Sequence, residues 1–148
     1  MRILPTIFLI ACGAVFTVFS VRQPDLLASN DFLSDFVSNQ FINVIVVIVT
    51  VSLVSITQIN LEYSRIERRF KKRVFQVPRK SLNLSAAILV LILFVSLLLS
   101  FLKAHFSSSL TAASFIHSLA LIVLFEAAFI MYDLIRVVYT LAADEPLE

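Results

Sequence analysis

Four stretches of the chain consist almost entirely of apolar residues, and shorter polar segments separate them. They cover residues 3–21, 41–61, 83–102 and 111–132. A helix needs about 20 mostly apolar residues to cross the hydrocarbon core of a bilayer, and each stretch is about that long. The pattern predicts an all-α polytopic membrane protein, with four transmembrane helices in a single domain over residues 1–148.

The composition agrees with membrane insertion and argues against an enzymatic or metal-binding function. Of the 148 residues, 59% are hydrophobic, only 15% are charged and one is glycine. A soluble domain is usually less apolar, and a phosphate-binding loop needs several glycines. The sequence also contains no catalytic or metal-binding motif. We therefore expect neither an enzyme nor a cofactor nor a metal site, and the lone Cys12 cannot form an intrachain disulfide.

Positive charge is concentrated in one connection. Eight of the twelve Lys and Arg residues lie between positions 62 and 80, after the second apolar stretch. Basic residues of membrane proteins are enriched on the cytoplasmic side. With both chain ends inside, ten basic residues are cytoplasmic and only Arg22 and Lys103 are outside. This predicts a multi-pass protein of the bacterial inner membrane with cytoplasmic termini.

Two segments near the amino terminus allow alternatives. The first apolar stretch could instead be a signal peptide cleaved after Val18-Phe19-Ser20, although we favour a retained helix. After it, residues 29–31 (Ser-Asn-Asp) offer caps for a short helix with apolar positions at helical spacing. This helix either lies at the outer interface or forms the entry to the second span.

The basic connection is predicted to be a helix over residues 62–77 that continues the second span into the cytoplasm and ends before Pro78. Its residues Ile66, Phe70 and Val74 form an apolar stripe that needs a cover. Anionic headgroups, an acidic cytosolic protein and nucleic acid are the possible ligands of such charge. The stripe favours protein docking, and no direct nucleic-acid contact is expected. The candidate partner-binding residues are the cations Arg65, Arg68, Arg69, Lys71, Lys72, Arg73, Arg79 and Lys80.

Polar residues within the second span recur every seven positions. Asn43, Thr50 and Thr57 thus share one stripe, which we expect to face other helices. The stripe is either a hydrogen-bonded seam between helices or the lining of an ion path.

The last span carries the remaining intramembrane polar candidates. An ionised Glu126 in lipid costs several kcal/mol, so we expect it to face the bundle, with Thr57 and Gln58 at its depth as partners. It would make a structural contact or serve a proton path. His117 lies nearly opposite on the helix and is expected at a helix interface. Asp133 lies near the inner surface, where a local pair with Arg136 is possible.

The string SFIH (Ser114 to His117) opens the last span, and LIVLF follows it. Together with four helices, internal termini and a basic connection between the second and third spans, this resembles the small membrane subunits of bacterial anti-phage systems. The Kiwa membrane subunit and the lambda phage-exclusion membrane protein are two kinds. The first kind implies an oligomeric sensor that holds a cytosolic effector, and the second implies ion leakage that depolarises the host.

Two functions follow as hypotheses. The first is an oligomeric inner-membrane scaffold or sensor in anti-phage defence, which recruits a cytosolic effector through its basic helix. The second is a small ion- or proton-conducting channel that depolarises the membrane. For both we expect a homo-oligomer in a bilayer with anionic headgroups.

Overall fold

The computed structural model describes residues 3–71, 75–106 and 109–143, and every regular element in these ranges is helical. Four helices are long and three are short. The elements are α1 (Ile3–Arg22), α2 (Pro24–Ala28), α3 (Asp31–Asp35), the π-helix η1 (Phe36–Gln40), α4 (Phe41–Phe70), α5 (Gln76–His105) and α6 (Leu110–Ala143). The predicted all-α class is confirmed.

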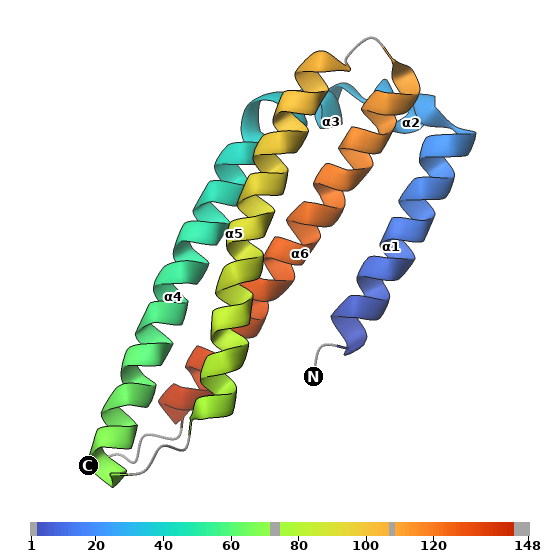
Figure 1. Ribbon diagram of the computed structural model, residues 1–148. Coiled ribbons are helices and arrows are strands. Elements are labelled where there is room, and N and C mark those ends of the chain that lie inside the picture. Colours follow the sequence, from blue (N-terminus) through green and yellow to red (C-terminus); the bar gives the residue numbers. More distant parts are fainter. Residues whose placement is uncertain (1–2, 72–74, 107–108, 144–148) are drawn as a thin grey trace.

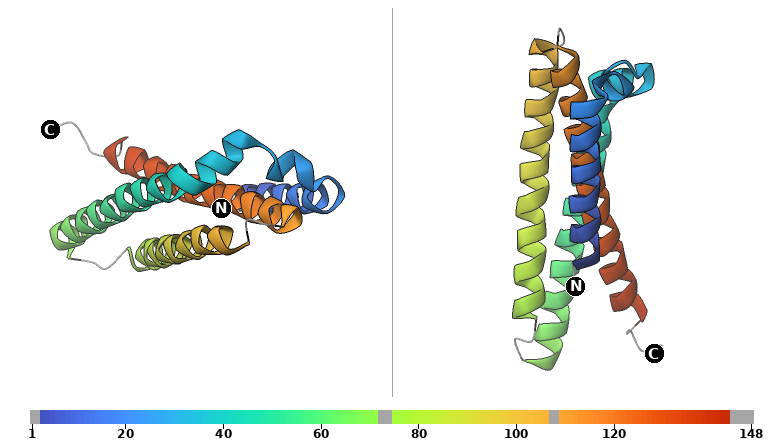
Figure 2. Two further views of the ribbon diagram at one scale, coloured as in Figure 1. Left: turned by 90° about the horizontal axis from the view of Figure 1, so that it is seen from above. Right: turned by 90° about the vertical axis from the view of Figure 1, so that its right-hand side faces the viewer.

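Helix α6 is the centre of the molecule (Figure 1). It contacts α1 and α2 as well as α4 and α5, whereas α1 packs mainly on α6. The end of α4 and the start of α5 lie at one end, and α2 and α3 lie at the other (Figures 1 and 2). We call the first the basic end and the second the short-helix end.

Three of the helical segments are long and apolar enough to cross a membrane: Asp31–Phe70, Gln76–His105 and Leu110–Thr140. These contain three of the four predicted spans. In α1, the described apolar segment Ile7–Arg22 is shorter. A membrane-embedded protein is therefore supported, and the fourth span stays a prediction.

The core is a seam in which α4 and α5 each contribute a residue every third or fourth position. On α4 these residues are Phe41, Ile45, Val49, Ser52, Ile56, Ile59 and Tyr63. On α5 they are Leu82, Ser85, Leu89, Ile92, Ser96 and Leu99. Alternating steps of three and four are typical of left-handed helix packing, and the small serines let helix backbones approach closely.

Helix α1 is attached to α6 at two levels. The Phe8 ring packs in a T-shaped arrangement against the rings of Phe125 and Phe129, and its centroid lies 6.1 and 5.5 Å from theirs. A hydrogen bond of 2.8 Å joins the buried hydroxyls of Ser20 and Ser118 near the short-helix end. Most of the other side chains described between Ile7 and Arg22 are exposed.

At the short-helix end, the predicted cap is confirmed. The Asn30 side chain accepts a hydrogen bond from the backbone N–H of Leu33, at 3.0 Å, and so begins α3. The single short helix expected here is in fact two α-helices and a π-helical turn that leads into α4. Figure 2 shows these pieces crossing the ends of the long helices.

At the basic end, the predicted helix over residues 62–77 must be corrected. Helix α4 ends at Phe70, and its C-cap Lys71 has a left-handed conformation with φ 52° and ψ 26°. Helix α5 begins at Gln76 and contains Pro78, which a helix tolerates in its first turn. The basic segment is therefore split between two helices of a hairpin, and α4 extends nine residues past Leu61.

Candidate functional site

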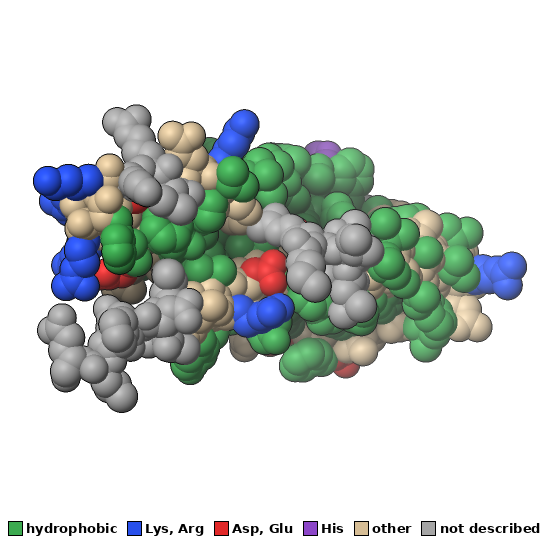
Figure 3. Space-filling view, turned by 90° about the horizontal axis from the view of Figure 1, so that it is seen from below, with side chains coloured by type: hydrophobic (Ala, Val, Ile, Leu, Met, Phe, Trp, Pro, Cys, Tyr) green, Lys and Arg blue, Asp and Glu red, His purple; other side chains and the backbone are tan. Residues whose placement is uncertain are grey.

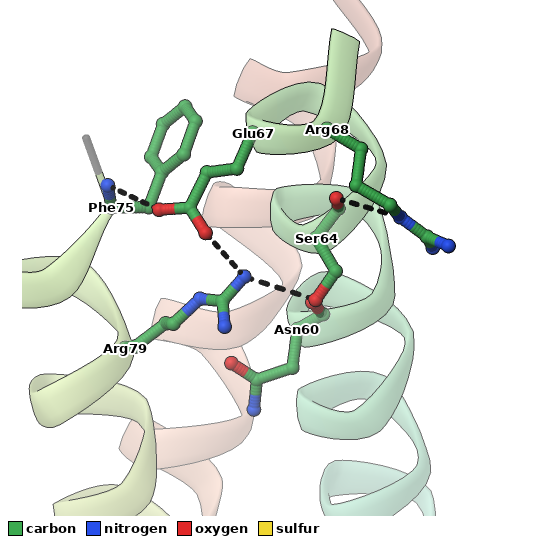
Figure 4. A network of polar contacts seen from close by, with 6 residues as sticks. All are labelled: Asn60, Ser64, Glu67, Arg68, Phe75 and Arg79. Atoms are coloured by element: carbon green, nitrogen blue, oxygen red, sulfur yellow. Dashed lines mark hydrogen bonds and ion pairs between the residues drawn. The ribbon is translucent and has the colours of Figure 1, made fainter. Parts of the chain in front are cut away.

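The hairpin at the basic end is closed by one carboxylate (Figure 4). Oε1 of Glu67 accepts a hydrogen bond from the backbone N–H of Phe75 at 3.0 Å, and its Oε2 pairs with the Arg79 guanidinium at 3.0 Å. The same guanidinium donates to the Ser64 hydroxyl at 3.0 Å. Beside this network the rings of Tyr63 and Phe75 stack, with centroids 4.5 Å apart. The contacts join the end of α4 to the start of α5.

These contacts change which basic residues are available to bind a partner. Arg79 is half-buried and holds the hairpin, so it is not a free surface cation. Arg65 pairs with Glu62 at 2.6 Å, and Nε of Arg68 donates to the Ser64 carbonyl at 3.2 Å. Both of these arginines remain exposed. Two further candidates, Lys72 and Arg73, lie outside the described residues.

The remaining candidates form the exposed part of the basic end. Arg69, Lys71 and Lys80 are exposed, and so is the Phe70 ring, at 67% of its surface. In the view of Figure 3, Lys and Arg side chains gather at one extremity while the flanks are mostly hydrophobic. We call the exposed side chains of Arg65, Arg68, Arg69, Phe70, Lys71 and Lys80 the basic platform.

The platform combines charge with an apolar group. Of the predicted apolar stripe, Ile66 is half-buried and Val74 lies outside the described residues, which leaves Phe70 as the exposed member. An aromatic ring among cations suits a partner that is both acidic and apolar, because aromatic and Arg residues dominate binding energy at interfaces. The same combination also suits a membrane surface with anionic headgroups.

The polar stripe of α4 has an unexpected location. Asn43, Thr50 and Thr57 are exposed on the outside of the bundle, on the face opposite the buried seam, although we expected them to face other helices. The Thr57 hydroxyl donates to the Leu53 carbonyl at 3.0 Å, and the Asn43 amide donates to the Asn39 carbonyl at 3.4 Å. Helical periodicity identified the stripe but could not tell which side faces the bundle.

The acidic residues of α6 lie on one side of the helix, seven positions apart. Glu126 and Asp133 are both half-buried. The expected partners of Glu126 are elsewhere, because the Thr57 hydroxyl is bonded within α4 and Gln58 is exposed. Glu126 thus occupies a flank of α6 rather than its most buried face, which Ala127 and Ile130 occupy.

His117 anchors the short-helix end, as expected of a histidine at a helix interface. It is 1% exposed, and its Nδ1 lies 2.8 Å from the Leu27 carbonyl oxygen of α2. A neutral imidazole with its proton on Nδ1 donates this bond. Nearby, the Lys103 ammonium donates to the Ser34 carbonyl of α3. Two long helices thus hold the short helices through side chains that bind backbone oxygens.

Sequence reasoning missed Glu67, Lys103 and the Ser20–Ser118 pair. Each of these side chains bonds to a residue far along the chain, and periodicity within one helix carries no signal for such a contact.

No protein-family model, curated protein sequence or solved structure matches this chain.

Proposed function

We propose that this protein is a membrane-embedded scaffold that recruits an acidic soluble protein to the cytoplasmic face of the inner membrane. The observation that carries the proposal is the basic platform, where an exposed Phe70 ring lies among exposed cations at the end of apolar helices. The resemblance to membrane subunits of anti-phage systems supplies the setting, in which the soluble protein is a defence effector.

Charge asymmetry supports the cytoplasmic location of the platform. At the opposite end, the described basic residues of the long helices are Arg22, Lys103 and His105, and Lys103 is engaged by the Ser34 carbonyl. The enrichment of Lys and Arg at one end is the usual mark of the cytoplasmic side. A cysteine introduced at Phe70, in a Cys12→Ser background, should react with an impermeant maleimide only after the cells are permeabilised. Labelling in intact cells would refute this orientation.

Recruitment is tested by copurification from cells that express the native partner genes. Reversal of charge at Arg68, Arg69, Lys71 and Lys80 to Glu should release the soluble protein, because these side chains are exposed and the Glu67 bonds to Phe75 and Arg79 do not involve them. Arg79 must be left intact, since its loss would disturb the hairpin itself. Reversal at Arg22, at the other end, is the matched control.

Two further results complete the test. Phe70→Ala should weaken capture at constant charge, which distinguishes a docking site from loose attraction. The captured protein should be lost as ionic strength rises, because exposed charges are screened over about 10 Å at 0.1 M salt. If the quadruple reversal retains the same partner as the parent, recruitment through this platform is wrong.

A channel is the second candidate function. The outward position of the α4 stripe determines where its conducting path would lie. Within one described chain the seam between α4 and α5 is apolar apart from serines, so a path lined by Asn43, Thr50 and Thr57 would form between copies. Purified protein in liposomes should then conduct ions, and Thr50→Val should reduce the flux. Absence of flux from the parent protein would reject this candidate.

A further inference from the structure

The outward face of α4 carries a complete second seam. Its members follow the steps four, three, four, three and four, and every one is exposed: Asn43, Val47, Thr50, Val54, Thr57 and Leu61. At about 100° per residue these positions lie opposite the buried seam of the same helix. Helix α4 thus has two faces with the periodicity of a coiled coil, and the described chain covers only one.

The outward face of α5 provides a contrast within the same chain. It has the same spacing and exposure, but all of its members are apolar: Leu84, Ala87, Leu91, Phe94, Leu98 and Phe101. Large apolar side chains are what a lipid-facing surface needs. The α4 face instead has a polar residue every seven positions, and an aliphatic residue follows each polar one four positions later.

We propose that the outward seam of α4 is the contact surface for a second copy of this chain, with α4 packed against α4 about a twofold axis along the membrane normal. The inference deepens the proposed function and rests on it, because it specifies how the scaffold oligomerises. It assigns the polar stripe to a protein interface in place of lipid.

Membrane topology makes a second copy a suitable occupant. Two copies inserted in the same orientation present α4 helices that run parallel, so equal positions lie at equal depth. Asn43 then meets Asn43, and Thr50 meets Thr50. A side-chain amide has both donors and an acceptor, and a hydroxyl can donate and accept, so each polar group complements its own symmetry mate.

The local bonds of the stripe leave capacity for such partners. The Asn43 amide donates to the Asn39 carbonyl at a long 3.4 Å, which leaves its side-chain oxygen available. The Thr57 oxygen donates to the Leu53 carbonyl but can still accept. In heptad terms the aliphatic members Val47, Val54 and Leu61 occupy the a positions, because three positions separate each valine from the next polar member, and the polar members occupy the d positions.

The proposed seam also has a defined end. After Leu61 the next equivalent exposed position is Arg68, where two copies would bring like charges together. The helices should therefore separate at the basic end. Two basic platforms would then lie side by side, which doubles the charge available to an acidic partner.

Disulfide crosslinking in native membranes tests the proposal. Single cysteines at Val47 and Val54, in a Cys12→Ser background, leave all three polar residues intact. The matched control is Leu91→Cys on the outward face of α5, which is 60% exposed, while Val47 is 61% exposed. Under copper-phenanthroline oxidation, both α4 variants should give at least tenfold more covalent dimer than the control.

The outcomes separate this inference from recruitment. If the α4 cysteines give no more dimer than Leu91→Cys, the α4 interface is wrong, whether or not a soluble protein copurifies. If they crosslink while charge reversal has no effect on the copurified protein, the interface stands and recruitment through the platform fails.

Discussion

Removal of the Glu67 carboxylate should open the hairpin at the basic end. Glu67→Ala removes the bond to the Phe75 amide and the ion pair with Arg79, and the Glu67 side chain is only 15% exposed. Hydrogen bonds to charged groups contribute roughly 1.5–3 kcal/mol each. The Arg79 side chain is 33% exposed, so solvent screening reduces its share to about 1 kcal/mol. The expected loss of stability is about 2.5–4 kcal/mol.

Glu62 provides the matched control, since it is also a glutamate of α4 paired with an arginine. Its pair with Arg65 is solvated, with 42% of the Glu62 and 68% of the Arg65 side chain exposed. Exposed pairs contribute about 0–1 kcal/mol, so Glu62→Ala should have little effect. The two variants are compared by unfolding the purified protein in a fixed detergent mixture. Circular dichroism monitors the unfolding, because the chain has no tryptophan.

A double-mutant cycle isolates the ion pair. Glu67→Ala, Arg79→Ala and the double variant should show a coupling of about 1 kcal/mol, because the two side chains contact each other directly. Two results would refute the reasoning: a Glu67→Ala variant as stable as Glu62→Ala, or a coupling below about 0.3 kcal/mol. The first result would mean that ring stacking and helix packing alone hold the α4–α5 turn, and the second that the ion pair adds nothing to the Glu67 bond with the Phe75 amide.

Three further changes have definite expected outcomes. His117→Ala removes the side chain that binds the Leu27 carbonyl, so hydrogen exchange of α2 should accelerate while that of the α4–α5 seam is unchanged. Ser20→Ala should cost about 1–2 kcal/mol because it leaves the buried Ser118 hydroxyl without its partner, and adding Ser118→Ala should recover part of that loss in thermal unfolding. Ser52→Ala should leave stability unchanged or raise it by up to about 1 kcal/mol, since the buried Ser52 hydroxyl has no hydrogen-bond partner among the described residues, and the same unfolding assay measures it.

The elements that were predictable from sequence are those set by local composition. Long apolar runs specified helices over residues 41–61, 83–102 and 111–132, because a bilayer-length run of such residues has few alternatives. The Asn30 cap was also readable, since it depends on a side chain and a backbone N–H only three residues away. The end of α4 was not, because Lys71 adopts a left-handed conformation that usually marks glycine.

The candidate site shows the same division at the level of single residues. The clustering of cations was visible in the sequence, yet Arg79 and Arg68 are indistinguishable there, although one holds the hairpin and the other is exposed. Their difference depends on Glu67, which reaches Phe75 and Arg79 only after the chain has turned back. The α4 stripe obeys the same rule, because periodicity places Asn43, Thr50 and Thr57 on one face while tertiary packing decides which face is covered. The structural cations of a basic cluster can therefore be told from the exposed ones only when the contacts of each are known. Charge reversal at the exposed cations then tests binding without disturbing the fold.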